Sequence, residues 1–120
     1  MLVEDLKVYQ KLFKLALEVN DLTLNFPKFE MFELGSQLRR SSNSPPANLA
    51  EGFSNKHTNI YLESICRAQG EMRETRHHLK MAYHKKYITK NKLDYFLNEY
   101  EECAKMLYGL EKSLLKNHKK

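Results

Sequence analysis

The sequence predicts an all-α protein, an up-down-up-down four-helix bundle with a kinked second helix, folded as one domain over residues 1–120. Two observations support this prediction. The chain of 120 residues holds only four glycines and three prolines, and long stretches without either residue favour helix over sheet. Apolar residues also recur three and four positions apart along four segments, which is the spacing of one helix face. The connections are short, so successive helices should be antiparallel neighbours.

The first helix should end before Pro27, because its apolar pattern stops there. The residues of its main stripe recur at three and four positions: Leu6, Tyr9, Leu12, Phe13, Ala16, Val19 and Asn20. Val8, Leu15 and Leu22 form a second apolar line, seven residues apart. Two apolar faces are more than a monomeric bundle needs. The second line should therefore pack against a kinked neighbour or lie between subunits.

The second helix is expected from about Lys28, through Phe29 and Phe32, towards Asn55. Two adjacent prolines interrupt this segment. Proline removes a backbone donor and clashes with the preceding turn, so a helix that continues past the pair must kink. The kink is expected between residues 42 and 47.

The third helix should begin at Thr58 or Asn59, either of which can cap it, and residues 85–88 should close it. Arg76 falls in the middle of its apolar face, so this arginine must be paired or must reach out at a helix seam. Thr89 is a suitable N-cap for the fourth helix. The apolar stripe of that helix consists of Leu93, Leu97, Tyr100, Ala104, Leu107, Leu110 and Leu114.

The segment at residues 36–52 reads SQLRRSSNSPPANLAEG. Together with Ala68-x-Gly70-x-x-x-Glu74 and Tyr87-Ile88, it resembles the four-helix-bundle family named for 23S rRNA intervening-sequence proteins. The resemblance covers about residues 26–88. Pro45 stands where the family usually has an aliphatic residue, and Arg76 stands where it often has an acidic one.

The resemblance implies a non-enzymatic homo-oligomer, commonly a pentameric ring. Some relatives are encoded within inserts of the large ribosomal RNA gene. Others are accessory proteins to the reverse transcriptases of diversity-generating retroelements and bind nucleic acid and the polymerase. The partners it implies are therefore further copies of this chain, RNA or DNA, and a protein such as a reverse transcriptase.

The formal net charge is +5, and the second half of the chain carries it: residues 56–88 have a net charge of +4. This excess is compatible with a nucleic-acid partner, although a solvated lysine-rich surface would also explain it. Arg73, Arg76 and Lys80 are three or four apart, so they share one side of the third helix and could hold a phosphate backbone. Arg39 and Arg40 form a second candidate group.

Five positions of the motif are expected to have structural roles: Pro46, Glu51, Gly52, Gly70 and Glu74. Glu51 should pair with one residue of the arginine pair, and Glu74 is another possible partner, because buried charges persist only when paired. Gly52 is expected to allow a chain turn and Gly70 a close approach between helices.

Other classes of function find little support in the sequence. Glu74-x-x-His77 has the spacing of a di-iron site, but such a site needs a second copy of the motif, so we expect no metal and no cofactor. No glycine-rich phosphate loop or paired nucleophile is present, and no apolar run approaches the length of a membrane span. The acidic N-terminus does not resemble a signal peptide. A cytoplasmic, non-enzymatic protein is expected, either a nucleic-acid binder or a protein-interaction scaffold.

Overall fold

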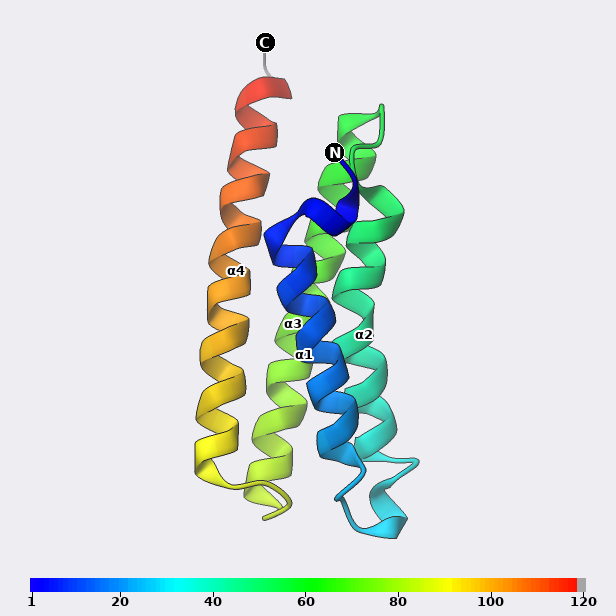
Figure 1. The fold of residues 1–120 in the computed structure, drawn as a ribbon, viewed down its shortest axis with the longest axis vertical. Helices are drawn as coiled ribbons and strands as arrows, with labels where there is room; N and C mark the ends of the chain where they lie inside the picture. Colours follow the sequence, from blue (N-terminus) through cyan, green and yellow to red (C-terminus); the bar gives the residue numbers. More distant parts are fainter. Residues whose placement is uncertain (119–120) are drawn as a thin grey trace.

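Residues 1–118, which the computed structural model describes, form four α-helices and no strand (Figure 1). The helices alternate in direction along a molecule of 52 × 23 × 20 Å, so the all-α four-helix bundle is confirmed. Within the described residues, no helix combines the length and apolar character that crossing a membrane requires. The helices are α1 (Lys7–Thr23), α2 (Leu34–Gly52), α3 (Thr58–His84) and α4 (Lys90–His118), with short 3-10 helices η1 (Val3–Asp5) and η2 (Lys28–Glu30).

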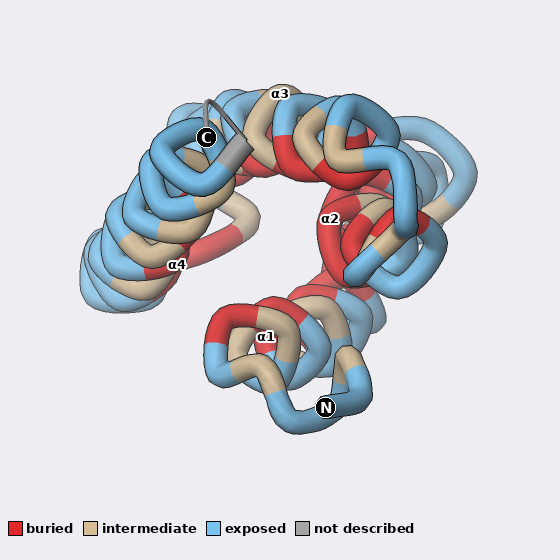
Figure 2. Tube along the Cα trace, turned by 90° about the horizontal axis from the view of Figure 1, so that it is seen from above, coloured by how far each residue is buried: buried red, intermediate tan, exposed pale blue. Residues whose placement is uncertain are grey.

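The helices follow one another around a single apolar core, with the buried side of each facing inwards (Figure 2). Among the four pairs of neighbouring helices, α2 and α3 pack together most extensively and α1 and α4 least extensively. The α2–α3 seam contains polar side chains as well as apolar ones. The hydroxyls of Ser41 and Thr75 lie 2.9 Å apart, share a hydrogen bond and are both fully buried.

Helix α2 begins later than the sequence indicates. The expected start at Lys28 is wrong, because η2 and a turn precede Leu34. The buried carboxylate of Glu30 accepts hydrogen bonds from the Leu34 amide, the Lys85 ammonium and the Tyr87 hydroxyl. The bonds from Lys85 and Tyr87 lower the pKa of this carboxyl. Glu30 therefore satisfies a free amide at the start of α2, as an N-cap does, and holds the break in the helix.

The two prolines lie inside α2, where the kink was expected, and the helix continues through them. Both rings are buried. Their missing amides leave the carbonyls of Ser41 and Ser42 without the usual helical donor. The Ser44 hydroxyl donates to the Arg40 carbonyl one turn earlier, at 2.8 Å, and so does not replace either missing donor. The chain therefore keeps helical geometry here while its backbone ladder is interrupted.

The second apolar line of α1 is not an outer face. Val8, Leu15 and Leu22 are all buried in the core, so of the two expected alternatives this line packs within the bundle and does not lie between subunits. The apolar residues that α1 does expose include Phe13 and Leu17, which are 50% and 57% exposed. Periodicity alone cannot say which of two apolar lines faces the neighbouring helices, so the sequence assigned the surplus face to the wrong residues.

The expected ends of the last two helices agree with the structure to within a few residues. Helix α3 begins at Thr58 with His57 at its N-cap position, so the expected cap at Thr58 or Asn59 is wrong. The His57 amide donates instead to the Asn55 side chain. The helix ends at His84, and two residues later Lys86 adopts a left-handed conformation with φ of 68°. The Thr89 hydroxyl accepts the Lys92 amide at 3.2 Å, which confirms Thr89 as the cap of α4.

Candidate nucleic-acid interface

Arg39 is committed to the interior of the fold. Its guanidinium donates to the Thr23 hydroxyl at the end of α1, at 2.9 Å, and to the Met31 carbonyl in the turn before α2, at 2.7 Å. The side chain is half-buried by these contacts. Arg39 joins three segments of the chain and has little freedom to bind a phosphate.

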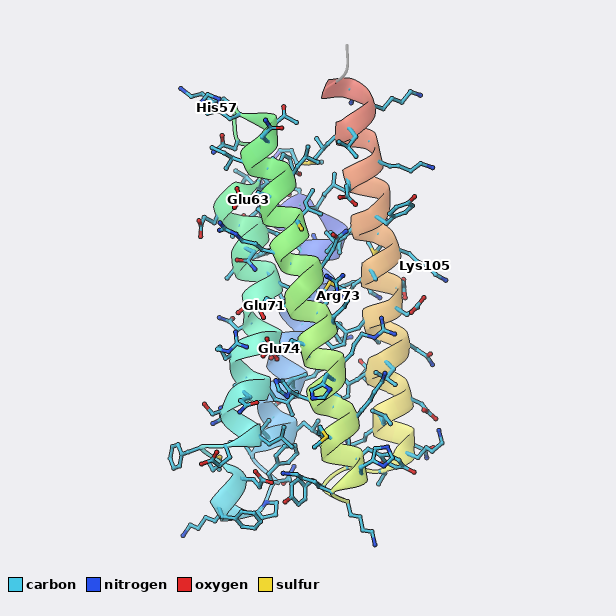
Figure 3. The ribbon with its side chains drawn as sticks, turned by 180° about the vertical axis from the view of Figure 1, so that it is seen from behind. His57, Glu63, Glu71, Arg73, Glu74 and Lys105 are labelled. Carbon is cyan, nitrogen blue, oxygen red and sulfur yellow. The ribbon has the colours of Figure 1, made fainter. Side chains whose placement is uncertain are left out.

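Arg40 belongs to a charged network between α2 and α3. Its guanidinium pairs with Glu71 at 2.9 Å and also with Glu74. Glu74 in turn contacts the Nε2 of the buried His78 at 3.1 Å. Burial alone would raise the pKa of the Glu74 carboxyl, but the hydrogen bond with His78 and the pair with Arg40 outweigh burial and lower it. Figure 3 shows Glu71 and Glu74 on the side of α3 towards α2.

The expected pair between Glu51 and the arginines does not form, because both arginines have other partners. Glu51 is exposed and, within residues 1–118, takes part in no ion pair or side-chain hydrogen bond. Glu74, the other expected partner, does pair with Arg40. The network therefore uses two carboxylates of α3, and no charge from the end of α2.

The cations of α3 differ in their availability. Arg76 reaches across the α3–α4 seam to Glu101, with 3.3 Å between Nη2 and Oε2, so this residue on the apolar stripe is paired as expected. Arg73 and Lys80 are exposed, and neither has an acidic partner within the described part of the chain. Of the five predicted cations, these two remain free to meet an external anion.

A shallow groove of about 320 Å³ lies between α3 and α4 on this side of the molecule. Arg73 points into the space between the two helices, whereas Lys105 lies on the outer side of α4 (Figure 3). The groove is lined by Gln69, Met72, Arg73, Arg76, Ala104, Tyr108 and Glu111. We refer to these seven residues as the α3–α4 groove.

Tyr108 is a residue of this groove that the sequence did not single out. Its side chain is 58% exposed, and the ammonium of Lys112 lies 5.9 Å from the centre of its ring. The sequence signal was weak but present, since the two residues are four positions apart beside the apolar stripe of α4. The opposite wall of the groove could not be assigned without knowing how α3 and α4 are aligned.

The close contact between helices that the sequence suggested for Gly70 occurs at Gly52, the last residue of α2. Gly52, expected at a chain turn, is buried against α3, and a Cβ placed on it would lie 2.3 Å from both Cβ and Oγ of Ser64. Gly70, expected at a close helix contact, has only an Arg73 nitrogen near such a Cβ, at 3.9 Å. The close approach between helices therefore depends on Gly52.

A second hollow, of about 550 Å³, lies between α1 and α2. Its α1 wall contains the exposed Phe13 and Leu17, and its α2 wall is mostly polar and includes the buried Pro46. We refer to this feature as the α1–α2 groove. Its other lining residues are Ala16, Asn20, Ser36, Arg39, Arg40, Asn43 and Ser44.

Comparison with known proteins agrees with this architecture. The family model described as 23S rRNA-intervening sequence protein matches residues 4–109. A crystal structure of a protein with unknown function from the S23 ribosomal protein family of Bacteroides thetaiotaomicron superposes with a TM-score of 0.80, at 24% sequence identity. The match covers 91% of this chain and 98% of that one, and it shows the shared fold. No curated protein matches the chain.

Proposed function

Because the chain belongs to the 23S rRNA-intervening sequence protein family, we propose that it is a non-enzymatic accessory protein that binds RNA or DNA through phosphate contacts. The observation that supports this proposal is the pair of exposed cations on α3, Arg73 and Lys80, which have no acidic partner among the described side chains. They are seven residues apart, which is two helical turns or about 10.5 Å along one side.

The affinity of a single subunit should be low. Two free cations neutralise few phosphates, and each phosphate contact is weakened by salt. A homo-oligomer would repeat the pair on every subunit, so that several weak contacts act together on one strand. Binding should therefore be salt-sensitive, depend on assembly and show little preference for sequence.

Reversing both charges, as Arg73→Glu with Lys80→Glu, should weaken binding to all sequences alike. Because two phosphate contacts per subunit are lost, the slope of log K against log salt should become shallower by about 1.4 to 1.8 per engaged subunit. Fluorescence anisotropy with labelled RNA and DNA oligonucleotides, over a salt series, measures both quantities.

The matched control is Lys28→Glu with Lys56→Glu, which changes the net charge equally at two exposed positions away from this side of α3. This control should retain most of the binding. If the Arg73/Lys80 variant keeps its oligomeric state and binds as tightly as the wild type, these cations are not the site. If the wild type fails to bind even at low salt, the nucleic-acid proposal is wrong and the protein-interaction function takes its place.

The second candidate function is a protein-interaction scaffold, and the α1–α2 groove favours it. Exposed apolar side chains that border a hollow are typical of surfaces that bind other proteins. We propose that copies of the chain assemble through this groove into a homo-oligomer larger than a dimer, of which a pentameric ring is one form. Ring closure requires that this groove meet a different surface of the next copy.

Light scattering tests this assembly directly. The wild type should have a mass well above twice the 14.2 kDa of one chain. Phe13→Asp with Leu17→Asp should lower that mass, because the charges would be buried in the interface. Met81→Asp, a similar change at an exposed position of α3, should leave it unaltered. A wild type that is monomeric at micromolar concentration would disprove the assembly.

A further inference from the structure

Tyr108 differs from most aromatic residues of the protein in what its ring contacts. Many of the described rings lie against another ring, as Tyr9 does against Phe13 and Phe53 against Tyr61. Tyr108 has no aromatic neighbour among the described residues, and its hydroxyl makes no hydrogen bond within the same part of the chain. Its ring is more than half exposed and borders the α3–α4 groove. The ring is therefore accessible to solvent in large part, beside the Lys112 ammonium that lies 5.9 Å from its centre.

The charges around the groove favour an anion with a planar group attached. Arg73 is unpaired within the described residues, and it lines the groove with Tyr108. Lys112 stands over the tyrosine ring. Arg76 is held by a single contact to the exposed Glu101, and surface pairs of this kind are weak enough for a phosphate to compete. Glu111 accepts a hydrogen bond from Gln69 at 3.4 Å, and its negative charge opposes an anion.

The size of the groove and the exposed ring beside it favour a single-stranded nucleic acid over a duplex. Its volume of about 320 Å³ is at the lower end of the range for small-ligand sites, and this size is suited to one nucleotide. In a duplex the faces of the bases are covered by their neighbours, so only phosphates could reach this surface. In a single strand the bases can turn outwards and stack on aromatic rings.

We propose that the α3–α4 groove binds an unpaired nucleotide of single-stranded RNA or DNA, whose base stacks on Tyr108 while Arg73 contacts the adjoining phosphate. This inference rests on the proposed nucleic-acid binding and adds to it the strandedness of the target. Stacking is tolerant of base identity because every base has a flat face. The groove therefore selects single strands without reading their sequence.

The experiment compares fluorescein-labelled 12-nucleotide strands, oligo-U and oligo-dT, with 12-base-pair RNA and DNA duplexes at one salt concentration. The wild type should bind the single strands at least tenfold more tightly. Tyr108→Ala should weaken single-strand binding about tenfold and leave duplex binding and the salt slope unchanged, since no phosphate contact is lost. Tyr108→Phe keeps the ring and should retain the single-strand preference. Glu111→Gln removes an opposing charge and should strengthen binding to single strands.

The outcomes separate this inference from the function on which it rests. If Tyr108→Ala binds single strands as well as the wild type while the Arg73/Lys80 charge reversal weakens binding, phosphate binding stands and the stacking site is wrong. If the wild type binds duplex as tightly as single strand, the inference is also wrong. If the wild type binds neither, both proposals fail. Because Tyr108 is exposed, unchanged circular dichroism of Tyr108→Ala shows that the effect is not one of folding.

Discussion

Replacing Gly52 with alanine should lower the free energy of unfolding by about 2–3 kcal/mol, the upper part of the usual range for an overpacked contact. The added Cβ would lie 2.3 Å from Cβ and Oγ of Ser64, much closer than two such atoms can approach. The atoms that it meets include a Cβ fixed to the backbone of α3, so rotating a side chain cannot relieve the clash. The end of α2 must move away from α3, and a chemical denaturation curve measures the loss.

Another glycine of the bundle and a compensating change at Ser64 provide two controls. Gly109→Ala places its new methyl group where nothing lies within 4 Å, and in a helix interior it should stabilise by about 0.5–1 kcal/mol. A Ser64→Gly change combined with Gly52→Ala removes the atom that the new Cβ meets. The double variant should therefore lose less free energy of unfolding than the two single variants lose in sum. If Gly52→Ala and Gly109→Ala change stability equally, the close contact of α2 and α3 is not as described.

Replacing Arg39 with alanine should cost about 2–3 kcal/mol of stability. Its guanidinium donates to the Thr23 hydroxyl and to the Met31 carbonyl, and hydrogen bonds that involve a charged group contribute about 1.5–3 kcal/mol each. Because the side chain is half exposed, the expected loss is smaller than the two contributions added together. Arg39→Lys should restore little of the lost stability, because one ammonium cannot reproduce the two hydrogen bonds that the planar guanidinium makes in different directions. Thermal and denaturant unfolding measure the change.

Arg73→Ala is the matched control, since this arginine is exposed and unpaired within residues 1–118. It should leave stability within about 0.5 kcal/mol of the wild type while it weakens nucleic-acid binding. Arg39→Ala should show the reverse pattern when it is measured at a temperature where the variant is folded. An Arg39→Ala protein that is fully stable but unable to bind nucleic acid would assign Arg39 to the interface after all.

The helices themselves were predictable because their signals are local. Three- and four-residue spacing located all four, and the Thr89 cap depends on an amide only three residues away. The start of α2 was not predictable in the same way. It depends on Glu30, whose carboxylate is held by Lys85 and Tyr87, more than fifty positions further along the chain. No window of neighbouring residues contains that information.

The candidate interface was predictable only in part, for a related reason. Helical spacing correctly grouped the cations of α3, but whether a cation is free depends on the carboxylates of other helices. Arg76 meets Glu101 of α4, and Arg40 meets Glu71 of α3. Tyr108 reaches the same groove from α4, through the alignment of two antiparallel helices. Charge and spacing supply the candidates, and the packing selects among them.

The buried hydroxyl pair of Ser41 and Thr75 has a consequence for how α2 and α3 are aligned along the bundle. Two apolar helix faces can slide by one turn, about 5.4 Å, and still bury similar surfaces. A slide here would break the hydrogen bond between these hydroxyls, which lie 2.9 Å apart and are fully buried. Each would keep only a carbonyl of its own helix, Leu38 for Ser41 and Glu71 for Thr75, and a hydrogen bond of this kind contributes about 0.5–1.5 kcal/mol. The hydrogen bond in this polar seam thus favours one axial register over its neighbours, even where it contributes little to the overall strength of packing.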